Sequence, residues 1–72
     1  MAINAWLEQQ LDRMTDGIHA GKTRRRKIDS FTRLGISERM LRTAVVARGW
    51  RVAQIGLDYV FAPPGYTIRP IV

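Results

Sequence analysis

The spacing of hydrophobic positions changes along the chain, and this change separates helical segments from extended ones. Near the N-terminal end, apolar residues recur at intervals of three and four, as on one face of a helix: Ile3, Leu7, Leu11, Met14 and Ile18. This pattern predicts a helix over about residues 3–20, with Gly21 at its end. A shorter stripe at spacing three predicts a second helix over about residues 24–34; its members are Ile28, Phe31 and Leu34.

A tight turn is expected between this second helix and a third. Gly35 suits a backbone with positive φ, and Ser37 stands where a helix N-cap is expected. Glu38 follows in the first turn, where a negative charge suits the helix dipole. The third helix, over about residues 38–48, is expected to bury Leu41, Ala44, Val45 and the stem of Arg48.

After Gly49 the period changes from about four to two, which is typical of strands. The alternation predicts a β-hairpin over about residues 50–62, with Gly56-Leu57 as a two-residue turn. In this register Val52 lies opposite Phe61, and Gln54 lies opposite Tyr59. Residues 63–72 form a tail with Ile68, Ile71 and Val72 available for packing. The predicted fold is a single, mainly α domain: a three-helix core with a C-terminal two-stranded β-hairpin.

Positive charge is concentrated in the middle of the chain. The net charge is +6, but residues 22–51 carry ten Lys or Arg against two acidic residues, a net charge of +8. Such a concentration is the electrostatic pattern of a polyanion-binding element. In a helix that begins near Arg24, four cations would crowd the positive end of the dipole, each unfavourable by roughly 0.3–1 kcal/mol. An anion would relieve this repulsion; the alternative is a solvated segment that serves only solubility.

The sequence offers little for catalysis or nucleotide binding. Gly21-Lys22-Thr23 matches only the end of a phosphate-binding loop, because Asp16 stands where the loop needs its first glycine. There is no cysteine, and His19 has no nucleophile or acid at a fixed spacing. We therefore expect neither an enzyme nor a cofactor or metal site. Apolar runs are far shorter than the ~20 residues that span a bilayer, so a cytoplasmic protein is expected.

The order helix, short helix, Leu34-Gly35-Ile36-Ser37 turn, helix and hairpin resembles a winged helix-turn-helix DNA-binding domain. In that family a turn glycine precedes an apolar residue, a Ser or Thr cap and apolar helix positions, matched here by Gly35, Ile36, Ser37, Leu41 and Ala44. The resemblance covers about residues 24–62. It implies sequence-specific binding of double-stranded DNA by a small transcription regulator of bacterial, phage or plasmid origin.

The resemblance implies that the outward face of the third helix contacts bases. Spacing places four residues on that face: Arg39, Arg42, Thr43 and Val46. Phosphate contacts are expected from Lys22, Thr23, Arg24, Arg25, Arg26, Lys27, Arg33, Ser37 and Arg51. The hairpin tip carries no cation, so the hairpin is expected mainly to cover the core.

A homodimer is also expected, through the first helix with Trp6 or through the tail. Two other functions stay open at this point. One is a protein-interaction module, such as an inhibitor or adaptor, that applies its basic face to an acidic partner. The other is RNA binding. In both of these, Arg39 and Arg42 would have no role in distinguishing one DNA sequence from another.

Overall fold

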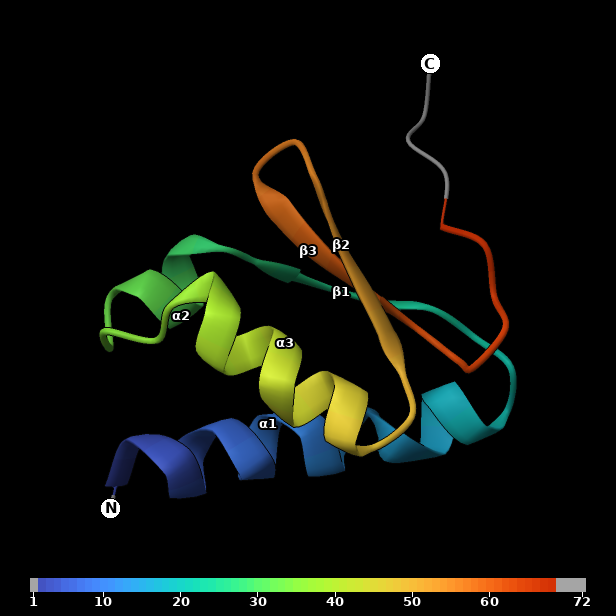
Figure 1. Ribbon diagram of the computed structural model, residues 1–72, viewed down its shortest axis with the longest axis horizontal. Helices are drawn as coiled ribbons and strands as arrows, with labels where there is room; N and C mark the ends of the chain where they lie inside the picture. Colours follow the sequence, from blue (N-terminus) through green and yellow to red (C-terminus); the bar gives the residue numbers. More distant parts are fainter. Residues whose placement is uncertain (1, 69–72) are drawn as a thin grey trace.

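The computed structural model describes residues 2–68, with side chains from residue 5 onward. Its elements are α1 (Ala2–His19), β1 (Arg24–Lys27), α2 (Asp29–Thr32), α3 (Glu38–Ala47), β2 (Arg51–Ile55) and β3 (Asp58–Ala62) (Figure 1). The three strands form one antiparallel sheet in the order β1-β3-β2. The side chain of Ile3 and the tail residues Ile71 and Val72, for which packing was expected, lie outside the described part.

The expectation of a mainly α fold with a two-stranded hairpin is wrong, because the sheet has a third strand. β1 occupies Arg24–Lys27, where the second helix was expected to begin, and α2 has only four residues. In a strand the four successive cations alternate between the two faces of the sheet, whereas in a helix they would crowd its positive end. Arg24–Lys27 pairs with β3, which is distant in sequence, and this pairing makes the segment a strand. The helix that the apolar stripe predicted therefore begins only at Asp29. Leu34, the last member of that stripe, is exposed.

The hairpin formed by β2 and β3 confirms the predicted register. Val52 pairs with Phe61, and Gln54 pairs with Tyr59. The connecting turn is Gly56-Leu57, and Gly56 has a φ of +61°. This conformation suits the first position of a two-residue type II′ turn, which explains why a glycine stands there.

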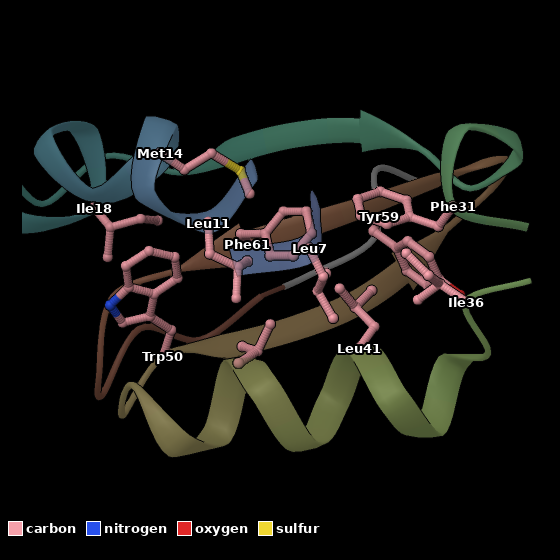
Figure 2. Close-up of a cluster of buried hydrophobic side chains, with 11 residues drawn as sticks. Leu7, Leu11, Met14, Ile18, Phe31, Ile36, Leu41, Trp50, Tyr59 and Phe61 are labelled. Carbon is pink, nitrogen blue, oxygen red and sulfur yellow. The ribbon is translucent and has the colours of Figure 1, made fainter. Parts of the chain in front are cut away.

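The core lies between α1, α3 and the face of the sheet that carries Tyr59 and Phe61. Figure 2 shows its buried side chains: Leu7, Leu11, Met14, Ile18, Phe31, Ile36, Leu41, Trp50, Tyr59 and Phe61. The ring of Phe31 lies 5.6 Å from the rings of both Trp6 and Tyr59, in edge-on geometry. Trp6, which was considered for a dimer interface, thus packs against the core. In Figure 2, α3 and β1 lie on opposite sides of this core.

Candidate nucleic-acid interface

A bend over residues 33–37 joins α2 to α3. Gly35 has a φ of +76°, and its N–H donates to the carbonyl of Thr32 at 3.0 Å. The Ser37 hydroxyl accepts a hydrogen bond from the Met40 N–H at 3.2 Å, which caps the start of α3. The predicted bend and cap are therefore confirmed, and local hydrogen bonds set the direction in which α3 leaves α2.

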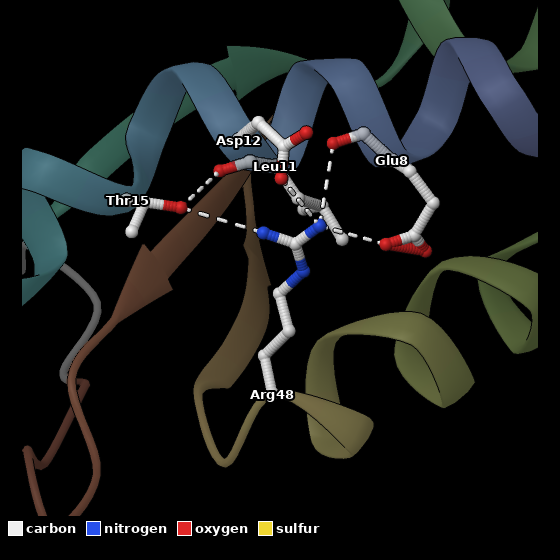
Figure 3. Close-up of polar contacts among 5 residues, drawn as sticks. All are labelled: Glu8, Leu11, Asp12, Thr15 and Arg48. Atoms are coloured by element: carbon white, nitrogen blue, oxygen red, sulfur yellow. Dashed lines mark hydrogen bonds and ion pairs between the residues drawn. The ribbon is translucent and has the colours of Figure 1, made fainter.

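The inner face of α3 is as the spacing predicted. Leu41 and Val45 are fully buried, and Ala44 and Arg48 are half-buried. Arg48 does more than pack its stem, because its guanidinium reaches across to α1 (Figure 3).

Arg48 Nη2 donates to Glu8 Oε1 at 2.7 Å and to Asp12 Oδ1 at 2.8 Å, and Nη1 donates to Thr15 Oγ1 at 3.4 Å. Hydrogen bonding to Glu8 raises the pKa of Arg48; burial opposes this effect, and Asp12 adds to it. The Arg48 guanidinium also lies 5.4 Å from the ring of Trp50.

These contacts fix the C-terminal end of α3 on α1, and sequence analysis missed them. The sequence signal for this contact was the pair Glu8 and Asp12, which lie one helical turn apart beside the apolar stripe and can together bind a cation from another helix.

The outer face of α3 is uncovered in the part of the chain that the structure describes. Arg39, Thr43 and Val46 are all exposed, and Val46 is 69% exposed. Among the described side chains, no carboxylate forms an ion pair with Arg39. The Thr43 hydroxyl donates to the Arg39 carbonyl at 2.9 Å, so its methyl group is the part left for other contacts. The predicted exposure of this stripe is confirmed, and its role stays a prediction.

Arg42 is exposed but lies apart from the rest of the stripe. Its Nη1 donates to the Val52 carbonyl on β2 at 3.2 Å, and its Nη2 lies 3.5 Å from Glu38 Oε1. The guanidinium therefore caps a backbone group at the edge of the sheet. Contact with a base would require Arg42 to release Val52.

The cations of β1 do not form a single surface with each other. Arg24 and Arg26 lie opposite Phe61 and Tyr59, on the face of the sheet that meets the helices. Arg25 and Lys27 lie on the other face, where Arg25 Nη1 is 3.4 Å from Asp58 Oδ2.

The absence of a side chain at Gly17 in α1 leaves room for the Arg24 guanidinium. A Cβ added at Gly17 would come within 2.4 Å of the Arg24 guanidinium, so this head group lies directly over the helix backbone. The hypothesis that an anion relieves crowding at a helix N-terminus loses its basis, because these cations lie on a strand.

The other residues considered for phosphate contacts are spread over several elements. Lys22 is exposed and Thr23 half-buried in the loop between α1 and β1. Arg33 Nε lies 2.9 Å from Asp29 Oδ2 on α2, in a largely exposed pair. Arg51 Nη1 donates to the Tyr66 carbonyl in the tail at 3.3 Å. The cations that are concentrated in the sequence are therefore distributed over several elements and over both faces of the sheet.

Comparison of the chain with protein-family models, with curated proteins and with solved structures found no match. Between residues 2 and 68, no helix is long and apolar enough to cross a bilayer. The described side chains also include no group of three or more His, Cys, Asp or Glu residues placed to hold a metal ion.

Proposed function

We propose that the chain is a small cytoplasmic transcription regulator that binds double-stranded DNA sequence-specifically through α3. The observation that carries this proposal is that α3 is held along its inner face and at both ends, while its outer face is uncovered in the described part of the chain. Leu41 and Val45 fix its inner face, and the Ser37 cap and Arg48 fix its two ends. The face left open carries Arg39, Thr43 and Val46.

The chemistry of this open face suits the major groove, which is about 12 Å wide and admits a helix. Arg39 forms no ion pair with a described carboxylate, so its guanidinium can donate paired hydrogen bonds to guanine O6 and N7. The methyl groups of Thr43 and Val46 suit contact with a thymine methyl. A β-branched apolar residue as exposed as Val46 is also more easily explained by a partner than by helix propensity.

The capped start of α3 adds a phosphate contact to the proposal. Ser37 can donate its hydroxyl hydrogen to a phosphate while its oxygen keeps the helix cap. Arg42 joins the interface only if it releases the Val52 carbonyl, so we assign base contacts first to Arg39. A dimer that binds two half-sites remains a prediction.

The test is selection of bound sites from a pool of random duplexes, followed by affinity measurements on the selected site. We expect an enriched consensus, and we expect Arg39→Ala to lose about 1–3 kcal/mol of discrimination at one base position. Arg13→Ala is the matched control, because Arg13 is an exposed cation on α1. If no sequence is enriched, or if both variants weaken all sequences equally, α3 does not recognise bases.

One observation favours a second candidate, which is an interaction module for an acidic protein. A groove of about 430 Å³ lies between α1 and α3, and its apolar lining comes from Leu7, Met40, Ala44 and Ala47. An amphipathic helix could dock there and place a carboxylate on Arg39 at the rim. Salt separates the two candidates: about six phosphate contacts give a slope near −5 in log K against log salt, whereas an apolar groove gives a shallow slope.

A further inference from the structure

The hydrogen-bonding pattern of the sheet shows which backbone groups of β1 face outward. The Ile28 N–H donates to the Leu57 carbonyl at 3.0 Å, and this pair continues the ladder between β1 and β3 by one step. In an antiparallel ladder the hydrogen-bonded pairs alternate with non-bonded ones. Arg24 and Arg26 therefore direct their N–H and C=O groups to β3, whereas Arg25 and Lys27 direct theirs away from the sheet.

The opposite edge of the sheet agrees with this assignment, and a side chain bonds one of its outward groups. The same alternation gives Val52 outward-facing groups on β2, and the Val52 carbonyl indeed accepts a hydrogen bond from Arg42 Nη1. β1 ends the sheet on its other side in the described part of the chain. We call the outward backbone of Arg25 and Lys27, with the side chains of Arg25, Arg26 and Lys27, the β1 edge; Arg24 is left out because its guanidinium lies over α1.

The β1 edge is rich in donors and poor in acceptors. The outward carbonyl of Arg25 already accepts from Arg26 Nη1 at 2.8 Å. Among the described residues, the outward N–H groups of Arg25 and Lys27, the Lys27 carbonyl and the Lys27 side chain have no partner, and the Arg25 and Arg26 guanidiniums lie beside them. A peptide strand that paired with this edge would require free carbonyls as well as free N–H groups, and it would have to displace Arg26 from the Arg25 carbonyl. A phosphate backbone instead supplies hydrogen-bond acceptors and negative charge. Cations along an edge also oppose strand addition, so a protein strand is the poorer occupant.

Asp58 is the one carboxylate that the ladder places opposite this strand. It lies across from Lys27 on the outer face, and its Oδ2 is 3.4 Å from Arg25 Nη1. Half of the Arg25 side chain is exposed, so this pair contributes little and can exchange for a phosphate. Lys27 and Arg26 form no ion pair with a described carboxylate.

We propose that the β1 edge binds the phosphate backbone of a second duplex segment, so that one molecule holds two segments of DNA. The inference rests on the proposed function, because α3 holds the first segment. α3 packs beside β2, and β1 lies at the opposite edge of the sheet across the core (Figure 2). A straight duplex seated along α3 therefore does not reach the β1 edge, and the two surfaces act on separate segments.

The experiment is a bridging assay with the full chain. One duplex is fixed to beads, and capture of a second, fluorescent duplex is measured as protein and salt are varied. The variant is Lys27→Gln, and the matched control is Arg13→Gln, which removes one exposed cation from α1. Binding of the fluorescent duplex alone, at protein below saturation, is measured in parallel by anisotropy.

We expect the wild-type protein to capture the second duplex. Lys27→Gln is expected to weaken capture and to lower its salt slope by about one unit, for one lost phosphate contact. Arg13→Gln is expected to leave that slope unchanged. Lys27→Pro, which also removes the outward N–H, is expected to capture about fivefold more weakly than Lys27→Gln, for the loss of one hydrogen bond. A proline on an edge strand with its N–H side facing solvent leaves the ladder to β3 intact, and circular dichroism verifies the fold.

The outcomes separate this inference from the function on which it rests. If the chain binds single duplexes and needs Arg39, but captures no second duplex, the β1 edge proposal is overturned and the role of α3 stands. If Arg13→Gln weakens capture as much as Lys27→Gln, only overall charge matters and the proposal is again overturned. Binding that needs Lys27 but not Arg39 supports the β1 edge and contradicts the role of α3.

Discussion

Replacing Arg48 with methionine removes the guanidinium that joins α3 to α1 and keeps an unbranched stem. Two short hydrogen bonds are lost, to Glu8 Oε1 at 2.7 Å and to Asp12 Oδ1 at 2.8 Å. The cation–π contact with the ring of Trp50 is lost as well. Because these contacts set the position of the proposed recognition helix, their strength decides how firmly α3 is held.

The exposure of the three charged side chains determines how much stability the Arg48 contacts contribute. The side chain of Arg48 is 22% exposed, but those of Glu8 and Asp12 are 52% and 68% exposed. Water screens both carboxylates, so each ion pair should contribute near the upper end for surface pairs, about 1 kcal/mol. The contact with Trp50 adds about 0.5–1 kcal/mol. Arg48→Met should therefore lower the free energy of unfolding by about 2.5–3 kcal/mol, out of roughly 4–11 kcal/mol for a domain of this size.

Urea denaturation followed by circular dichroism measures this loss. We expect the difference between the two proteins to shrink at about 1 M salt, where the Debye length is about 3 Å. In a double-mutant cycle, Glu8→Gln should cost less in the Arg48→Met protein than in the wild type. A loss below about 0.5 kcal/mol, the range of ordinary surface substitutions, would refute the assignment of Arg48 as the link between the helices.

Three further predictions concern stability. Burial raises the pKa of the Tyr59 hydroxyl above its ordinary value of 10.0, with a further contribution from Glu38. The folded state thus favours the protonated phenol, so the free energy of unfolding should fall as pH rises above 10, and Tyr59→Phe should lack that part of the fall. Ser37→Ala should cost about 1 kcal/mol through loss of the α3 cap, measured by urea denaturation. Gly17→Ala should stabilise an Arg24→Ala protein by up to about 1 kcal/mol and the wild type by less, because only the wild type must move its guanidinium.

Local patterns predicted the elements that local chemistry controls. The stripe that begins at Ile3 predicted α1, the Gly35 to Ser37 segment predicted the bend and cap, and the period-two segment predicted the hairpin with its register. In each case the residues that fix the conformation are neighbours in the chain or lie across a two-residue turn. The exposed face of α3 followed from the same 3.6-residue period.

The third strand could not be predicted in this way, because its partner is more than thirty residues away. Arg24–Lys27 has no alternation of apolar and polar residues, so its strand character depends on pairing with β3. The missed strand also changed the candidate site, because the cations that were expected at a helix N-terminus lie on an edge strand. Phe31, by contrast, keeps the buried position that its stripe predicted, because its ring packs against those of Tyr59 and Phe61 on β3.

Backbone amide shifts during a titration with a selected duplex show directly which element meets the DNA. We expect the largest changes on α3 and the bend before it, over about residues 35–47. Changes on β1 should follow only when a second duplex segment is present in excess. Amides of α3 that stay unchanged while the duplex binds elsewhere would contradict the claim that this helix is the DNA-contacting element.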